Sequence, residues 1–153
     1  MINLSDLPAA PGSYVLQLHL ERTRLIMIGR QGRQRFSSGD YYYVGSAHGA
    51  GGLRARVSRH LRGDGIPHWH IDYMRAIAEV QNVLYTVTDI PLECVWSQAL
   101  AQLSPAIIPV PHFGSSDCRS GCAAHLVAFS RRVEIAAVLA PLTSTPIISL
   151  RLH

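Results

Sequence analysis

Apolar and polar residues alternate through the first third of the chain, and this period of two is typical of strands with one buried face. Residues 13–20 alternate in this way and are rich in β-branched and aromatic types, so they predict a strand. Residues 24–29 and 32–36 predict a hairpin closed by Gly29-Arg30-Gln31-Gly32. Residues 40–46, built around three consecutive tyrosines, predict the strand that follows.

From residue 53 the apolar period changes to that of a helix. Leu53, Val57 and Leu61 recur at every fourth position and form one apolar stripe, and a segment rich in Gly and Pro then ends the helix. Arg56 and His60 lie together at the edge of this stripe. They are therefore placed where a partly desolvated site can form.

A further strand and helix follow. Residues 80–88 predict the strand, and Pro91 is expected at the first position of the helix. Glu93 falls in the first turn, where a carboxylate complements the helix dipole. Residues 104–117 predict a loop, and residues 123–153 predict strand or short helix. The apolar stripe of the second helix is expected to contain Leu92, Val95, Trp96, Ala99, Leu100 and Leu103.

The composition describes a single domain over residues 1–153. The chain is 48% hydrophobic and 16% charged, enough apolar material to close one core. Its longest apolar runs are about ten residues, short of the roughly 20 that a spanning helix needs, so no membrane contact is expected. The first ten residues lack the features of a secretory signal, and three cysteines argue against a disulfide framework. A cytoplasmic location is expected.

All fourteen basic residues are arginine. Guanidinium binds two oxygens of a phosphate at once, although codon usage in a GC-rich genome also explains this choice. The balance of Arg against acids is +5 over residues 1–75 and −1 over residues 76–153. This concentration of positive charge in the first half favours a surface that faces phosphates.

Three motifs and one carboxylate follow one another in the chain. Gly12-Ser13-Tyr14 begins a predicted strand, Tyr43-Val44-Gly45-Ser46-Ala47 ends another, and Arg56 and Glu93 follow on the two predicted helices. In these residues the sequence resembles the GIY-YIG nuclease superfamily. It resembles more closely a poorly characterised branch that occurs alone or fused to endonuclease III-type repair glycosylases. That resemblance covers about residues 10–130 and rests on residues 42–47, 51–56, 67–73, 93–94 and 113–118.

The resemblance implies an α/β domain of the α+β kind, in which helices flank a central, mostly antiparallel sheet. It also implies metal-dependent cleavage of phosphodiesters, with Tyr14 as base or water-positioning group and Tyr43 assisting. Arg56 would stabilise a phenolate or phosphoryl charge, and Glu93 would hold Mg²⁺ or Mn²⁺. His60 stands where several relatives carry a histidine that orients the nucleophile or phosphate. The predicted hairpin is an insertion between the two Tyr motifs.

The proposed chemistry suits these residue types. A tyrosine, with a reference pKa of about 10, deprotonates water only where a cation stabilises its phenolate. One carboxylate is a common protein ligand for Mg²⁺ beside nucleic acid. Each residue also has a structural explanation, because Tyr14 and Tyr43 can fill a core, Arg56 can be solvated and Glu93 can stabilise a helix start. Their joint order favours the functional interpretation.

Further residues are predicted to contact nucleic acid. Ser46, Arg54 and Arg59 follow the second motif and line the first helix. The inserted hairpin carries three more arginines, which either extend this surface or prevent aggregation at a sheet edge. These hairpin arginines are Arg30, Arg33 and Arg35.

The segment 67–73 combines aromatic, imidazole and carboxylate side chains. Trp69 can stack on an unpaired base and His70 can contact phosphate, which suits single strands or flaps. The alternative is a packed strand or turn in which His70 and Asp72 form a hydrogen bond. Both interpretations stay open at the level of sequence.

The cysteines allow a second metal hypothesis. Cys94, Cys118, Cys122 and His125 supply three thiolates and one imidazole, a known donor set for zinc. The spacing of Cys118 and Cys122 is looser than in a usual zinc knuckle, and buried unreactive thiols are the alternative. Asp117 follows in the same region without an assigned role.

The sequence therefore predicts a metal-dependent endonuclease that acts on single-stranded or structured DNA in repair or processing. The alternative is a non-catalytic nucleic-acid-binding module that targets a partner repair enzyme. An RNA nuclease is a further possibility, because the mechanism needs no 2′-hydroxyl. A monomer is the default expectation.

Overall fold

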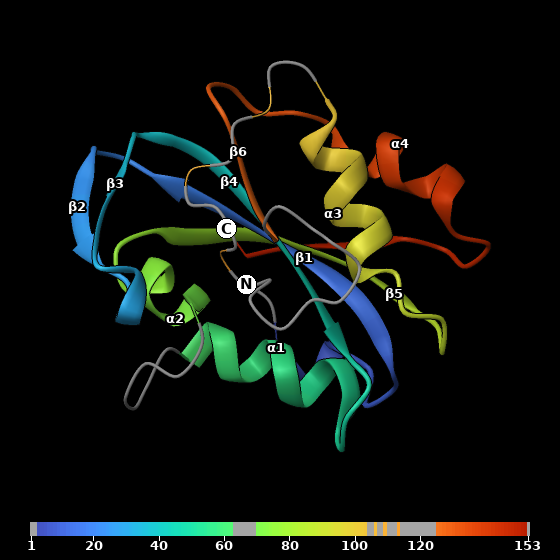
Figure 1. The fold of residues 1–153 in the computed structure, drawn as a ribbon. Helices are drawn as coiled ribbons and strands as arrows, with labels where there is room; N and C mark the ends of the chain where they lie inside the picture. Colours follow the sequence, from blue (N-terminus) through green and yellow to red (C-terminus); the bar gives the residue numbers. More distant parts are fainter. Residues whose placement is uncertain are drawn as a thin grey trace.

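The computed structural model describes residues 3–62, 70–103, 106, 109, 113 and 125–152. In this part of the chain, helices flank a five-stranded antiparallel sheet with the order β6-β4-β1-β5-β7, which confirms the predicted α+β fold (Figure 1). No helix in the described part is long and apolar enough to cross a membrane. The strands are β1 (Gly12–Leu20), β4 (Gly39–Ala47), β5 (Glu79–Val87), β6 (Leu126–Phe129) and β7 (Ile148–Arg151). The helices are α1 (Gly52–Arg62), α2 (His70–Arg75), α3 (Glu93–Ala101) and α4 (Ile135–Leu139).

Strand β1 lies at the centre of the sheet and is buried on both faces. Its neighbours β4 and β5 pair with it over nearly its whole length. Because side chains alternate along a strand, Tyr14 and Leu16 enter the core cluster under α1 and α2. Val15 enters a second cluster on the other face, which Trp96 of α3 and Leu139 of α4 complete. Two helical layers therefore cover opposite faces of one sheet.

The predicted hairpin insertion is present between the two Tyr motifs. Strands β2 (Arg24–Met27) and β3 (Arg33–Phe36) form a two-stranded sheet of their own, slightly shorter than predicted. Gly29 and Gly32 at the turn have φ of 43° and 77°, a region that favours glycine. The Ile28 amide donates to the Gly32 carbonyl at 2.9 Å and closes the turn.

The start of α1 is held by the segment that precedes β1. The amides of Leu53 and Arg54 donate to the carbonyls of Ala10 and Pro8, at 2.9 and 3.0 Å. Gly52 has φ of 57°, and a Cβ there would lie 2.3 Å from the Ala10 carbonyl oxygen. The glycine is needed because the two backbones approach so closely. This contact fixes α1 against the sheet, with Leu53 and Val57 buried as predicted.

Helix α3 begins at Glu93, so the predicted start at Pro91 is wrong by two residues. Leu92 caps the helix, and Leu92, Trp96 and Leu100 form its buried face at a spacing of four. Val95 was expected in this stripe but is 46% exposed. Ser97, which was not expected in the stripe, is 1% exposed, so the buried face centres on Trp96 and Ser97 and Val95 turns to solvent.

The segment 70–75 is helical, so the alternative of a packed strand or turn is wrong for its described part. Ile71 and Met74 are fully buried at a spacing of three, which is the contact that holds α2 on the core. Six residues are too few for an apolar period to identify a helix.

Residues 126–151 contain β6, α4 and β7, which agrees with the prediction of strand or short helix for this segment.

Candidate active site

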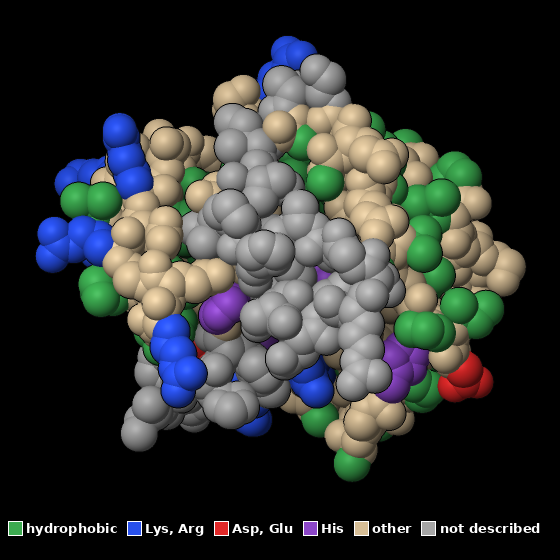
Figure 2. Space-filling view, in the orientation of Figure 1, with side chains coloured by type: hydrophobic (Ala, Val, Ile, Leu, Met, Phe, Trp, Pro, Cys, Tyr) green, Lys and Arg blue, Asp and Glu red, His purple; other side chains and the backbone are tan. Residues whose placement is uncertain are grey.

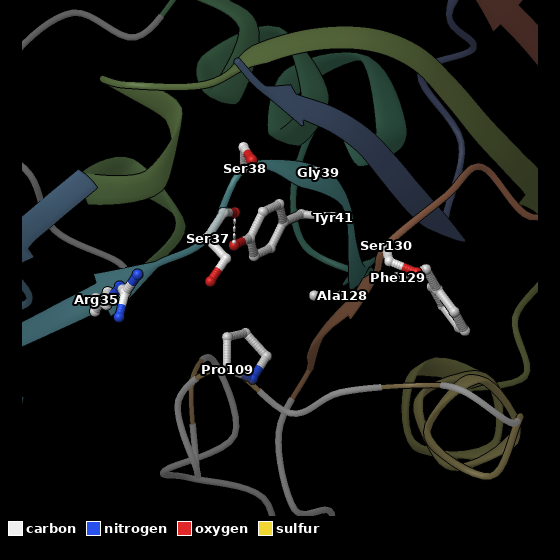
Figure 3. A pocket seen from close by; sticks show the side chains of 9 residues that line it. All are labelled: Arg35, Ser37, Ser38, Gly39, Tyr41, Pro109, Ala128, Phe129 and Ser130. Carbon is white, nitrogen blue, oxygen red and sulfur yellow. Dashed lines mark hydrogen bonds between the residues drawn. The ribbon is translucent and has the colours of Figure 1, made fainter. Parts of the chain in front are cut away.

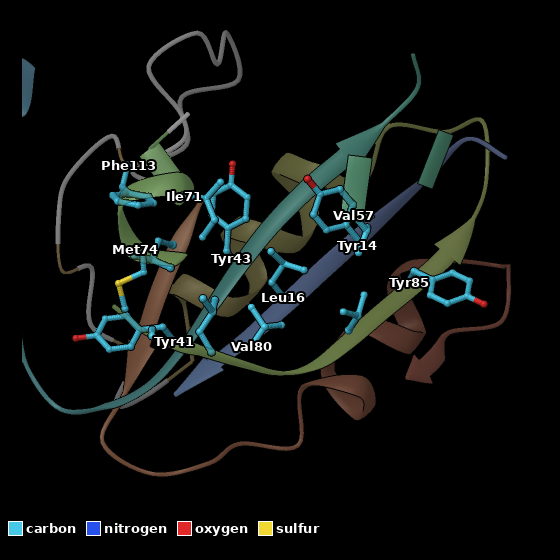
Figure 4. Packing of buried hydrophobic residues seen from close by; sticks show 14 of the residues in the cluster. Tyr14, Leu16, Tyr41, Tyr43, Val57, Ile71, Met74, Val80, Tyr85 and Phe113 are labelled. Carbon is cyan, nitrogen blue, oxygen red and sulfur yellow. The ribbon is translucent and has the colours of Figure 1, made fainter. Parts of the chain in front are cut away.

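The two Tyr motifs lie side by side on the central strands. Tyr14 of β1 is directly opposite Gly45 of β4, and Tyr43 is two residues before that glycine. Figure 4 shows both rings on one face of the sheet, with their hydroxyls pointing the same way. A Cβ at Gly45 would lie 2.4 Å from the Tyr14 ring and hydroxyl. The glycine of the second motif therefore makes room for the tyrosine of the first.

Helix α1 brings His60 and Arg56 to these tyrosines. The Tyr14 hydroxyl and His60 Nε2 are 2.8 Å apart in a buried hydrogen bond. Tyr14 is 1% exposed and His60 is 2% exposed. The Tyr43 and His60 rings form a T-shaped pair, with 6.1 Å between their centroids. The structure thus joins four of the predicted catalytic residues, since Arg56 also interacts with Tyr14 through charge and a side-chain hydrogen bond.

Both phenols are neutral at physiological pH. Burial raises the pKa of Tyr14 well above its ordinary value, and the charges of Tyr43 and Glu93 raise it further. Burial and the charge of Glu93 likewise raise the pKa of Tyr43. The Arg56 guanidinium lowers both pKa values. Arg56 therefore favours negative charge on either tyrosine.

His60 is a neutral imidazole at physiological pH. Burial lowers its pKa to about 4, and the Arg56 and Arg59 charges add to this effect. The Asp72 carboxylate opposes it, with Oδ1 4.0 Å from His60 Nδ1. Asp72 in turn accepts a hydrogen bond from Arg59 Nη1 at 3.3 Å. A neutral His60 can accept a proton at Nε2 from Tyr14.

Glu93 stands at the start of α3, on the border between the sheet and solvent. Its Oε2 accepts a hydrogen bond from Ser46 Oγ at 3.0 Å, and its Oε1 lies 3.0 Å from His125 Nδ1. The side chain is 28% exposed. Its negative charge raises the pKa of both Tyr14 and Tyr43. Ser46, predicted to bind nucleic acid, thus contacts the predicted metal ligand.

Two of the four proposed zinc ligands, Cys94 and His125, lie in the described part of the chain. Cys94 Sγ and His125 Nε2 are 3.9 Å apart. Cys118 and Cys122 lie outside the described residues, as does Asp117. Among the described residues, no group of three His, Cys, Asp or Glu side chains is arranged to hold a metal ion.

The predicted nucleic-acid contacts are distributed over different parts of the molecule. Arg54 Nε donates to the Leu7 carbonyl at 2.7 Å, and so anchors the N-terminal segment to α1. Arg59 binds Asp72, as described above. The His70 ring lies 5.3 Å from the Phe113 ring, whereas Trp69 lies outside the described residues. Arg54 and Arg59 therefore make structural contacts within the chain.

Two contacts of the site were not expected from the sequence. His125 was singled out only as a zinc ligand, yet it contacts Glu93 from a position 32 residues later. Asp72 was paired with His70 in one interpretation, yet it faces His60 and Arg59 of α1. No spacing in the chain signals these contacts, because each joins elements that meet only in the folded sheet.

Comparison with known proteins gives one family and no characterised relative. No curated protein matches the chain, and no solved structure does so either. A family model described as a domain of unknown function, DUF123, matches residues 13–145, which include Tyr14, Tyr43, α1, Glu93 and His125. The chain therefore belongs to the DUF123 family.

Proposed function

We propose that this domain is a metal-dependent endonuclease of the GIY-YIG type that hydrolyses phosphodiester bonds in single-stranded or structured DNA. One observation carries the proposal. The Tyr14 hydroxyl is hydrogen-bonded to His60, at 2.8 Å, in a buried cluster with Tyr43 and Arg56 and within the field of Glu93. These five residues come from four separate elements, and buried titratable groups with shifted pKa values gather at functional sites more often than elsewhere.

The geometry supports a proton relay from water to imidazole. Water attacks phosphorus and gives its proton to the Tyr14 oxygen, while the Tyr14 hydroxyl passes its own proton to His60 Nε2. The bond between phosphorus and the leaving oxygen breaks, and the leaving oxygen takes a proton from solvent. In this relay Tyr14 never exists as a free phenolate, which its burial disfavours. Proton transfer by a positioned side chain typically contributes about 10²- to 10⁴-fold to a rate.

The residues present fit Mg²⁺ held by one carboxylate. A carboxylate offers about four lone-pair positions, so the contacts of Glu93 with Ser46 and His125 leave room for a metal on its exposed side. Mg²⁺ often takes one or two carboxylates and completes its shell with water and phosphate oxygens. When bound, it supplies positive charge that neutralises the phosphoryl oxygens and lowers the pKa of a neighbouring water.

The test compares the wild type with Glu93→Ala and with Glu134→Ala, a matched control that removes an exposed carboxylate elsewhere. Labelled single-stranded, duplex and flap DNA, and the corresponding RNA, are incubated with each protein in Mg²⁺, Mn²⁺ or EDTA. We expect the wild type and Glu134→Ala to cut in metal and not in EDTA. Glu93→Ala should bind the substrates but not cut them.

Two outcomes would overturn this proposal. Cutting by Glu93→Ala at the wild-type rate would show that Glu93 does not hold the metal ion. Binding without cutting by all three proteins would identify a binding module that serves a partner enzyme. Cutting of RNA alone would keep the mechanism and change the substrate.

A further inference from the structure

The β2–β3 hairpin presents apolar and cationic side chains on one face. Leu25 pairs with Arg35 and Met27 pairs with Arg33 across the two strands. Side chains that are directly opposite in an antiparallel pair lie on the same face. Leu25 is 62% exposed and Met27 is 58% exposed. We call these four residues the hairpin face.

The reverse side of the hairpin fixes it to the core. Ile28 and Phe36 are fully buried, and Ile26 packs against the same cluster as Tyr14 and Tyr43. The rings of Phe36 and Phe113 are 6.2 Å apart, and those of Phe113 and Tyr43 are 6.3 Å apart. The hairpin face is therefore held in a fixed position relative to the candidate active site by two consecutive ring contacts.

The hairpin carries a strong positive charge. Residues 21–36 contain five arginines and one acid, Glu21. Across the described part of the chain, no ion pair involves any of these arginines. Figure 2 shows blue side chains gathered with green ones at the left edge, where Figure 1 places β2 and β3. Such a surface complements a polyanion.

A cavity of about 290 Å³ lies at the base of the hairpin, beside Arg35 (Figure 3). The Tyr41 ring lies at its inner wall, 2% exposed and with its hydroxyl donating to the Ser37 carbonyl, and Pro109 and Ala128 add to the apolar lining. An apolar lining with serine hydroxyls around it suits a nucleobase, and a guanidinium at the border suits its phosphate. The cavity is lined, among the described residues, by Arg35, Ser37, Ser38, Gly39, Tyr41, Pro109, Ala128, Phe129 and Ser130.

We propose that the hairpin face and this cavity bind unpaired nucleotides. Leu25 and Met27 contact bases that have left the stack, Arg33 and Arg35 neutralise the phosphates, and the cavity receives one base. An apolar side chain flanked by arginines is the combination that proteins insert where bases are unstacked. An intact duplex must first be unstacked, at a cost of a few kcal/mol per base step, whereas an unpaired strand presents its bases without that cost. The inference deepens the proposed nuclease function, on which it rests, by naming the part of the substrate that is recognised.

The experiment measures binding, so it does not depend on cutting. Fluorescence anisotropy with a labelled 20-nucleotide single strand and the matching duplex is recorded over a salt series in EDTA. The proteins are the wild type, Arg33→Gln with Arg35→Gln, and a control that removes the same charge, Arg132→Gln with Arg151→Gln. The control residues line a separate pocket with Gln17, on the sheet face opposite Tyr14.

We expect the wild type and the control to prefer the single strand. The hairpin variant should bind it about tenfold more weakly, and the slope of log K against log salt should fall by about 1.4, since each contact to a single strand contributes about 0.7. Equal binding by the hairpin variant and the control would overturn the inference. So would a preference for the duplex, or binding to anionic phospholipid vesicles in place of nucleic acid.

A second variant tests the apolar part without changing charge. Leu25→Ser with Met27→Ser should bind a strand that carries 2-aminopurine without the fluorescence rise that unstacking produces in the wild type. An unchanged rise would overturn the role of these two side chains. If the wild type cuts while all hairpin variants bind normally, only this inference fails. If the wild type binds through the hairpin and never cuts, only the proposed function fails.

Discussion

The buried Tyr14–His60 pair and the exposed hairpin face are two regions of opposite physical character. Tyr14 and His60 are 1% and 2% exposed, and burial shifts the pKa of both. Leu25 and Met27 are more than half exposed, beside arginines that face solvent. Burial in the first region shifts the protonation equilibria of Tyr14 and His60. The arginines of the second region stay in solvent, where their charge acts by attracting a polyanion.

This difference predicts different sensitivities. Charges in the buried region are screened little by salt, and their protonation depends on desolvation. Charges on the hairpin face are screened within about 10 Å at 0.1 M salt. The pair should therefore respond to pH and the hairpin face to ionic strength.

Tyr14→Phe should have the largest effect. The change removes the hydroxyl that contacts His60 and keeps the ring, so cleavage should fall by about 10²- to 10⁴-fold with little change in binding. Single-turnover cleavage measures the rate. Tyr85→Phe is the matched control, because Tyr85 faces Tyr14 from β5 and is also buried. An equal loss in both variants would contradict a specific role for Tyr14.

The buried histidine should make stability depend on pH. The folded-state pKa of His60 is about 4, against 6.5 when unfolded, so the unfolded chain gains a proton first as the pH falls. The free energy of unfolding should be unaffected by His60 above pH 6.5, where the imidazole is neutral in both states. It should fall by about 3 kcal/mol as the pH drops from 6.5 to 4. Urea unfolding across this range measures it. His60→Gln should flatten the decline, and an unchanged decline in this variant would contradict the assignment to His60.

Arg56→Ala should slow cleavage by about 10²-fold, because a single electrostatic stabiliser of the reaction is lost. The same change should raise the pKa of Tyr14 and Tyr43 further, since Arg56 lowers both. Arg62→Ala, at an exposed position of α1, removes the same charge away from the tyrosines. Similar rates for the two variants would show that α1 contributes only general positive charge.

Gly45→Ala should destabilise the buried region by about 1–3 kcal/mol, as overpacking of a core does. The added Cβ would meet the Tyr14 ring at 2.4 Å and displace the hydroxyl from His60. Thermal unfolding gives the stability, and single-turnover cleavage reports the displaced hydroxyl. Gly49→Ala is the control, because a Cβ there meets nothing within 4 Å. Equal stability of the two variants would contradict this packing.

Leu25→Ser with Met27→Ser should have the smallest effect on folding. Both side chains are exposed, so the free energy of unfolding should change by less than about 0.5 kcal/mol per site. Chemical unfolding measures this value beside the binding experiments. A loss of several kcal/mol would show that the hairpin face is part of the core, and would end the contrast between the two regions.

Much of the fold was predictable because its local signals agree with its tertiary structure. The alternation of apolar and polar residues predicted β1 and β4, and the Gly29–Gly32 turn predicted the hairpin. The apolar stripe that begins at Leu53 predicted α1. The errors fall where local signals are weak. Pro91 is a good first residue for a helix, but the chain turns helical only at Glu93, after the Leu92 cap. Helix α2 is too short to show a period and is held by Ile71 and Met74.

The site was predictable as a set of residues and not as a set of contacts. The order of Tyr14, Tyr43, Arg56 and Glu93 singled them out, and His60 was predicted from its place on the helix stripe and from the resemblance. The contact of Glu93 with His125 could not be derived from the sequence, because it joins α3 to the residue directly before β6. A sequence carries no direct record of such distances, since the sheet order that creates them is non-sequential.

The strands β1, β4 and β5, the inserted hairpin, the arginine-rich first half and the candidate site residues followed from the sequence, whereas residues 123–153 were predicted only as strand or short helix. These follow from local periods and residue types, which act over a few positions. The tertiary structure alone decided that Tyr14 and His60 share a buried hydrogen bond and that His60 stays neutral. It also decided that Leu25 and Met27 remain outside the core. Burial decides each of these, because desolvation depends on every element that packs around a group and on no single segment.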